Sequence, residues 1–320
     1  MPALDRTALV LRLRQRLRAA ANPDGGWPYY AGKASRIEPT AWVLLALTES
    51  SDAGPAARGQ FIAPPLRLLE TRQRGDGLLL DNPQAPPNFT ANGVAACVLA
   101  HLSDDAQAAS VLARLVGGLV AAKGVAIRTP LLDAIAAMKR LGAPRTAPGQ
   151  DNTLQAWPWI PDTFSWAEPT SWCLLALKKA RGLRTQAAEA RVGEAEALLA
   201  NRACASGGWN YGNASAFAQD LRPYVPTTAV ALIALQDRAA QPAVVRSLAF
   251  LDRSKLAEPS GFALGLAAMA LSIYDRDVTD VEDRLAADVE RAERIGNLQT
   301  LAVALYALSS SRHQWKAMRV

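Results

Sequence analysis

Two kinds of apolar pattern alternate along the chain. Over 9–20, 65–72 and 187–203, apolar residues return every three or four positions and charged residues fill the other face, which predicts amphipathic helices. Over 42–47 and 172–177 nearly every residue is apolar, and a helix that is apolar on all sides is buried on all sides. The pattern therefore predicts outer, half-exposed helices paired with inner, buried ones.

The buried segments are copies of one another. The decapeptide EPTAWVLLAL at 38–47 recurs as EPTSWCLLAL at 168–177, and a third copy, PTTAVALIAL, occupies 226–235. Each copy follows an aromatic loop, and the three loops contain DGGWPYY at 24–30, WPW at 157–159 and SGGWNYG at 206–212. Internal similarity of this kind indicates a repeat architecture.

A hairpin of one outer and one inner helix cannot bury the inner helix by itself, but hairpins stacked in a ring can. We therefore predict an all-α fold, an α/α toroid formed as a single domain by residues 1–320. Prolines interrupt the pattern over 52–75, and the irregular run 142–162 is expected to be a long loop within the toroid. Inner helices are expected near 40–50, 90–102, 130–141, 169–180, 227–237 and 262–273, with a last helix near 298–310 to close the ring.

The Gly-Gly-Trp loops that follow amphipathic helices, within 13–27 and 198–209, resemble the QW-type repeats of squalene cyclases and the repeats of protein prenyltransferase β-subunits. The resemblance covers nearly the whole chain at the level of the repeats. It implies the toroid fold and a central cavity that holds an apolar isoprenoid or another lipid.

The resemblance also points to two acids. In class II terpene cyclases, to which the repeats are similar, the motif D-x-D-D-T-A begins an inner helix, and a carboxylic acid there protonates an alkene or an epoxide. If Thr40 is aligned with the threonine of that motif, Glu38 occupies the central acid position. Alignment of Thr170 with the same threonine places Glu168 at the acid position, whereas the third copy has Pro226 there. The flanking aspartates of the motif are missing from both copies that carry a glutamate. The resemblance implies Glu38 and Glu168 as candidate catalytic residues.

A structural interpretation of the two glutamates stays open beside the catalytic one. An acid followed by proline suits the first turn of a helix, at the positive end of the helix dipole. Glu is a weaker N-cap than Asp, Asn, Ser or Thr. The two side chains are therefore expected either to anchor the helix starts or to face the cavity as polar groups.

Aromatic residues gather in the loops before the inner helices and within these helices. In the cyclases that the repeats resemble, cavity aromatics stabilise carbocations through their π faces. On this basis the candidate substrate-binding residues are Tyr30, Trp42, Trp157, Trp159, Trp166, Trp172 and Tyr224. Wedging of outer helices against the turns is the alternative, and it is the role expected for Trp27 and Trp209. If Trp42 and Trp172 fill the barrel, a terpene does not fit and a binding module is favoured.

The chain contains few of the residues that usually bind a catalytic metal ion. The two histidines are His101, which is expected to be a satisfied core residue on an apolar helix, and His313 in the polar tail. A catalytic zinc site needs about three protein ligands, and the chain has neither an Asp-x-Cys pair nor a DDxxD motif. No metal and no cofactor are expected.

Charge and cysteine usage limit the partners and the compartment. The net charge is +6, but no basic run is interleaved with stacking aromatics, so nucleic acid is not expected as a partner. Three separated cysteines predict a reduced, cytoplasmic protein. No apolar run reaches the ~18 residues of a membrane span, and the start of the chain does not have the pattern of a signal peptide. Peripheral membrane contact and an unidentified protein partner stay open.

Three functions remain as hypotheses. The first is a cyclase-like or isoprenoid-handling enzyme of unknown reaction, with Glu38 or Glu168 as proton donor or polar anchor. The second is a non-catalytic module that binds lipid or protein. The third is a carbohydrate-active α/α-barrel enzyme, in which the two glutamates form the paired carboxylates of the reaction, provided that they lie within roughly 10 Å of each other. The first two are preferred on the sequence.

Overall fold

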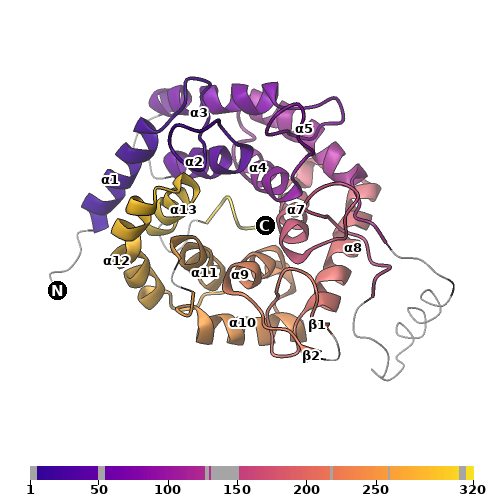
Figure 1. Cartoon of the computed structure of the whole chain (residues 1–320). Helices are drawn as coiled ribbons and strands as arrows, with labels where there is room; N and C mark the ends of the chain where they lie inside the picture. The colour runs from indigo at the N-terminus through magenta and orange to yellow at the C-terminus, as the bar shows by residue number, and fades with distance from the viewer. Residues whose placement is uncertain are drawn as a thin grey trace.

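The computed structural model describes residues 6–49, 55–126, 130, 151–216, 219–258, 260–309 and 315–320. Within these ranges the chain is almost entirely α-helical, and the helices form two concentric rings (Figure 1). The remaining regular elements are two short 3₁₀ helices and one two-stranded antiparallel sheet: η1 (Arg181–Leu183), η2 (Gln236–Arg238), β1 (Ser215–Ala216) and β2 (Gln219–Asp220). The predicted all-α toroid is confirmed.

The inner ring is formed by α2 (Ile37–Glu49), α4 (Phe89–His101), α7 (Ala167–Lys179), α9 (Val225–Ala234), α11 (Gly261–Ile273) and α13 (Leu298–Ser309). Each of these helices contacts the next, and α13 contacts α2. The ring is therefore closed by described helices alone. Helices from both sides of the undescribed residues 131–150 belong to it, because α4 packs directly on α7 and α13 on α2.

Each inner helix is preceded along the chain by a helix of the outer ring: α1 (Arg6–Ala19), α3 (Pro55–Thr71), α5 (Ala106–Ala121), α8 (Gln186–Arg202), α10 (Pro242–Ser254) and α12 (Thr279–Ile295). The outer helix α1 buries only Leu9, Leu13 and Leu17, which lie one turn apart on a single face. In α2, by contrast, every residue of 39–48 is buried. None of the helices in the described ranges is a candidate for crossing a membrane.

Tryptophans of the loops join the two rings. The indole N–H groups of Trp27, Trp157 and Trp209 each donate to a leucine carbonyl of the preceding outer helix, at 2.7, 2.9 and 2.8 Å. All three rings are buried. The wedge role expected for Trp27 and Trp209 is confirmed, and Trp157 has the same role.

Side chains of the inner helices hold these loops in a common register. The hydroxyl of Thr40 accepts the amide of Trp27 at 2.9 Å and lies 3.3 Å from the Trp27 carbonyl, to which it donates. Thr170 and Thr228 bind Trp157 and Trp209 in the same way, and the amide of Asn92 binds both backbone groups of Leu79. The residue two positions before each of these side chains therefore occupies an equivalent place at a helix start: Glu38, Thr90, Glu168 and Pro226.

Two predictions about elements need comment. The inner helix expected at 130–141 lies, apart from Pro130, outside the described residues, and the six inner helices close the ring without it. The prolines that were expected to interrupt the pattern do not end the helix, because α3 runs through Pro64 and Pro65. Pro64 lies against Gly25, where an added Cβ would come within 2.7 Å of the proline, so this turn of α3 packs closely on the loop before α2.

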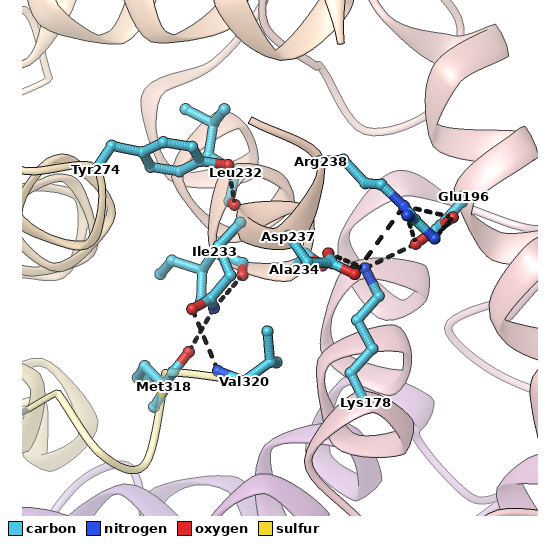
Figure 2. A network of polar contacts seen from close by, with 11 residues as sticks. Lys178, Glu196, Leu232, Ile233, Ala234, Asp237, Arg238, Tyr274, Met318 and Val320 are labelled. Atoms are coloured by element: carbon cyan, nitrogen blue, oxygen red, sulfur yellow. Dashed lines mark hydrogen bonds and ion pairs between the residues drawn. The ribbon is translucent and has the colours of Figure 1, made fainter. Parts of the chain in front are cut away.

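The segment 315–320 lies within the ring, at the end where the inner helices finish (Figure 1). Trp315 is fully buried and donates from its indole N–H to the Ser272 hydroxyl at 2.8 Å. Gln236 donates to the Met318 carbonyl at 2.8 Å and accepts the Val320 amide at 3.2 Å (Figure 2). This segment therefore occupies the end of the barrel opposite to the glutamates.

A buried ion-pair network lies beside this segment. Lys178, whose side chain is 2% exposed, pairs with Glu196 at 2.8 Å and with Asp237, and Arg238 pairs with Glu196 at 3.0 Å (Figure 2). Two cations thus face two carboxylates, so the buried lysine is compensated. The network ties the ends of α7 and α9 to α8.

Candidate functional site

The mouth of the toroid, meaning the end of the ring at which the inner helices begin, is built by loops that bind neighbouring helices. The first amides of α2, α4 and α7 donate to groups of the next loop around the ring, namely Asp81 Oδ1 (2.8 Å), the Trp159 carbonyl (2.9 Å) and the Tyr211 carbonyl (2.8 Å). The first amide at each of these helix starts is therefore bound by a neighbouring loop rather than by the carboxylates of Glu38 and Glu168.

Both carboxylate oxygens of Glu38 accept hydrogen bonds. The Tyr29 hydroxyl donates to Oε2 at 2.7 Å, and the Gln299 side-chain amide, which comes from α13, donates to Oε1 at 2.6 Å. Burial raises the pKa of Glu38, and the charge of Asp81 raises it further, while the two donors oppose this rise. Glu38 is thus a half-buried acid with two donors that favour its ionised form.

Glu168 has a poorer set of partners. Its Oε2 accepts one hydrogen bond, from the indole N–H of Trp159 at 3.3 Å. Burial, followed by the charge of Glu38, raises the pKa of Glu168 to about 7, and the Trp159 bond opposes this rise. The charge of one carboxylate therefore acts on the other, although α4 lies between their helices in the ring. The two acids belong to one electrostatic site at the mouth.

An aromatic cluster adjoins Glu168. Trp159 and Trp166 are stacked, with centroids 4.9 Å apart and an interplanar angle of 16°. Tyr211 lies 5.6 Å from Trp159 and 5.2 Å from Tyr224. Tyr211 and Tyr224 are 46% and 39% exposed, so their rings are open to a ligand. Flat apolar surface and an acid of raised pKa thus occur together.

Two tryptophans form the floor below the glutamates. Trp42 and Trp172 follow Glu38 and Glu168 by four residues, so each lies one turn deeper on the same helix face. Their rings meet edge to face at 5.6 Å, with 0% and 1% exposure. The barrel interior is therefore filled at this depth, and a ligand that reaches the glutamates lies above the tryptophan pair.

A buried polar atom without a partner occupies the third equivalent position. Thr90, on α4 between α2 and α7, is 5% exposed, and among the described residues its hydroxyl has no hydrogen-bond partner. By the register of the repeats it stands where Glu38 and Glu168 stand on their helices. Since buried polar groups are rarely left unpaired, this hydroxyl is a candidate contact for a bound molecule.

The other predicted site residues lie elsewhere. Tyr30 is 48% exposed and lines a pocket of about 440 Å³ with Ile295 and Leu298, between the loop before α2 and the start of α13. Trp157 has no exposed surface and anchors its loop. Of the predicted aromatics, Trp159, Trp166 and Tyr224 belong to the cluster beside Glu168, and Trp42 and Trp172 form the floor.

Sequence reasoning missed three partners of the glutamates. Tyr29, rather than its neighbour Tyr30, contacts Glu38, and a signal for this was present: Tyr29 and Trp159 both stand two positions after a wedge tryptophan and nine before a glutamate. Gln299 and Asp81 carried no local signal, because ring closure and loop packing bring them to α2.

The described residues contain no group of three or more His, Cys, Asp or Glu side chains that could hold a metal ion. His101 pairs with Glu49 at 2.7 Å, so it is a satisfied residue, as expected. His313 lies outside the described residues.

Comparisons with known proteins identify the architecture. No family model matches the chain, and no curated protein sequence matches it. Among solved structures, a protein from Actinoplanes is similar at 18% identity and a TM-score of 0.57, over 95% of this chain and 98% of that one. The type II terpene cyclase MstE from Scytonema is similar at 16% identity and a TM-score of 0.55, over 95% and 97%.

A second group of similar structures consists of glycosidases. A GH76 α-mannanase from Bacteroides thetaiotaomicron is similar at 11% identity and a TM-score of 0.63, over 96% of this chain and 95% of that one. Identities this low establish a shared fold and leave the chemistry to the site. The chain therefore has an α/α-toroid fold, which it shares with a type II terpene cyclase and with glycosidases.

Proposed function

We propose that the mouth of the toroid binds a small molecule and that Glu38 and Glu168 act on it as a coupled acid–base pair. The observation that carries this proposal is the equivalent placement of two half-buried carboxylates at the starts of α2 and α7, each bound by an aromatic donor nine positions earlier. Burial and then the charge of Glu38 raise the pKa of Glu168 to about 7, so Glu168 keeps its proton to higher pH than an ordinary glutamate. General acid–base groups work best when their pKa values lie near the operating pH.

The surroundings suggest different roles for the two acids. The donors Tyr29 and Gln299 favour the ionised form of Glu38, which suits a base. Glu168 accepts only the 3.3 Å bond from Trp159 and keeps its proton to higher pH than an ordinary glutamate, which suits an acid. The hydroxyl of Thr90, between them in the ring, is buried and has no hydrogen-bond partner among the described residues, so we assign it a substrate contact that needs local opening.

A glycoside is one substrate class that this arrangement supports, and its requirement is a separation of the two carboxyl groups of roughly 10 Å or less. A carboxylic acid of raised pKa is able to protonate a glycosidic oxygen, whereas protonation of an alkene needs a stronger acid, and both glutamates lack the flanking aspartates of the cyclase motif. The buried Trp42–Trp172 pair fills the barrel below the glutamates, so a substrate would bind on the side of the helix starts. Tyr211, Tyr224 and the Trp159–Trp166 stack offer flat faces on which a sugar ring can lie.

Glycoside turnover is the direct test. A panel of aryl glycosides and α-linked oligosaccharides is incubated with the wild-type chain and with Glu168→Gln, Glu38→Gln and, as a matched control, Glu189→Gln on the outer helix α8, where the carboxylate is 51% exposed. We expect turnover by the wild type and Glu189→Gln and its loss in the other two. Equal rates in all four proteins contradict the assignment, and saturable binding without turnover assigns the mouth to a non-catalytic module.

A second candidate is an isoprenoid substrate. It is favoured by the position of both glutamates at the acid place of the cyclase frame and by the aromatic faces beside Glu168, which could stabilise a carbocation. Incubation with squalene, oxidosqualene and shorter polyprenyl compounds tests it. A cyclised product from the wild type that is absent with Glu38→Gln or Glu168→Gln replaces the glycoside proposal.

A further inference from the structure

A separate cavity of about 240 Å³ opens beside Trp166, between the loop that precedes α7 and the end of α8. Its apolar wall includes Leu154, Phe164 and Trp166, and its polar wall includes Arg202 and Asn213. Phe164 is 46% exposed, so the cavity has an apolar entrance. Pockets for drug-sized ligands are usually larger than this, and the volume suits a molecule with a single ring.

The guanidinium of Arg202 is buried in this wall without an ionic partner. The residue is 5% exposed, and within the described ranges it forms no ion pair. Its donors reach two neutral oxygens, the Asn201 side-chain carbonyl and, at 3.1 Å, the Asp151 backbone carbonyl. Its Nε–H is buried with no partner among the described residues. Of the five N–H donors of an arginine, most therefore remain available.

The nearest acid does not neutralise this cation directly. Asp151 uses its Oδ1 to accept the amide and the hydroxyl of Thr153, at 2.9 and 2.6 Å. Burial lowers the pKa of Arg202 to about 10, and the more distant charge of Asp151 only opposes this effect. The guanidinium is thus held in a place that disfavours its charge.

A second buried arginine shows what compensation looks like in this fold. Arg191, also on α8, is 2% exposed. It pairs with Glu194, donates to three backbone carbonyls and lies over the Trp157 ring at 4.3 Å. Among the described residues, Arg191 has an acid and a structural task, whereas Arg202 has no ion pair and no aromatic stacking partner and lines a cavity. Because a buried cation is stable when it is paired, Arg202 has the capacity to bind an anion.

We infer that this cavity binds a small carboxylate whose apolar body lies against Phe164 and Trp166 and whose charge pairs with Arg202. A guanidinium edge presents parallel N–H donors that match the two oxygens of a carboxylate. The remaining polar wall is formed by uncharged groups, which is sufficient for one negative charge. The site is distinct from the glutamate pair, although Trp166 stacks on Trp159, the donor to Glu168.

The inference is tested with benzoate, its neutral isostere benzamide and inorganic phosphate as probes. Binding is measured by calorimetry and by the NMR shift of the Trp166 indole N–H, assigned by comparison with Trp166→Phe. We expect saturable binding of benzoate, a shift of the Trp166 signal, and at least tenfold weaker binding of benzamide and of phosphate. No benzoate binding, or equal binding of benzamide, overturns the inference, and tighter binding of phosphate assigns the cavity to a different anion.

Variants locate the bound probe. Arg202→Met should weaken benzoate binding at least tenfold, while Arg184→Met, at a 39% exposed arginine on the surface, should leave it unchanged. Since replacing a buried arginine can unfold the chain, Phe164→Ala provides a second test at an exposed position and should weaken binding severalfold. Unchanged affinity in Phe164→Ala and in a folded Arg202→Met places the ligand elsewhere. None of these readouts depends on turnover at Glu38 and Glu168.

Discussion

Glu38 and Glu168 hold the same place in two copies of one repeat, yet their neighbours differ. In both copies an aromatic residue nine positions earlier donates to Oε2, and a threonine two positions later holds the tryptophan loop. Glu38 has in addition Gln299 at 2.6 Å, whereas Glu168 has a longer bond to Trp159 and the charge of Glu38 nearby. The repeat places a carboxyl group at each helix start, and the neighbours that are not repeated set the pH at which it is charged.

The other inner helices show how far this difference extends. The equivalent position holds Thr90 on α4 and Pro226 on α9. Four copies of one backbone arrangement thus offer an acid with two donors, an acid with one donor, an unpartnered hydroxyl and an apolar ring. The repeats share nearly the same backbone arrangement, and they differ chemically because different side chains occupy the equivalent position.

The largest effect is expected on catalytic activity, where substitution of Glu168 and substitution of Glu38 should have different consequences. If Glu168 is the general acid on a glycoside, Glu168→Gln should lower kcat/KM by about 10²- to 10⁴-fold, the usual contribution of such a group. The loss should be smaller for substrates with good leaving groups, because these need less protonation, whereas Glu38→Gln should impair both kinds of substrate alike. Steady-state kinetics with matched aryl glycosides measures this. Identical profiles for the two variants would refute the assignment of separate roles.

The next effect concerns stability and pH. A carboxyl group whose pKa is higher in the folded chain stabilises it below the ordinary pKa of 4.5, and this contribution is lost as the pH rises through about 7. The difference corresponds to at most roughly 3 kcal/mol. The free energy of unfolding of the wild type should therefore fall between pH 5 and pH 8 more steeply than that of Glu168→Gln, as measured by urea unfolding.

The control for this prediction is Glu189→Gln, whose exposed carboxylate should leave the wild-type slope unchanged. Parallel curves for wild type and Glu168→Gln would mean that Glu168 titrates normally. In that case the two carboxylates do not form a coupled site, and the different neighbours of Glu38 and Glu168 do not give them different pKa values.

The fold was predictable because its signals are local. The periodicity of 9–20 and the all-apolar run 42–47 distinguish outer from inner helices, and the repeated EPT segments put Glu38 and Glu168 in equivalent register. The wedge role of Trp27 and Trp209 follows from the same repetition. Such features depend on residues within one hairpin, so sequence alone reveals them.

The details of the site depend on contacts between distant hairpins. Gln299 reaches Glu38 across 261 positions because α13 closes the ring on α2. The meeting of Trp42 and Trp172 depends on how far two non-adjacent inner helices are rotated. That no described residue forms an ion pair with Arg202 becomes visible only in the folded chain. No periodicity along the chain encodes these distances.

A smaller effect should follow from removing one donor to Glu38. Tyr29→Phe deletes the 2.7 Å hydrogen bond that favours the ionised form, so the pKa of Glu38 should rise by roughly one unit, since hydrogen bonds to charged groups contribute about 1.5–3 kcal/mol. Glu38 is then less charged near neutrality, and the pKa of Glu168 should fall. Carboxyl-carbon NMR titration measures both values. A change at Glu38 without any response at Glu168 would contradict the coupling.

The smallest expected effect concerns the matching donor on the other side. Trp159→Phe removes the 3.3 Å bond to Glu168, and because this bond is long, the pKa of Glu168 should rise by only ~0.5 unit or less. The same change also loses part of the stack with Trp166, so Trp166→Phe serves as the control that disturbs the stack and keeps the donor. A larger rise in Trp159→Phe than the rise of Glu38 in Tyr29→Phe would reverse the ranking of the two donors. Glu38 would then owe its better support to Gln299 alone, and the assignment of Glu38 as the base would rest on that one donor.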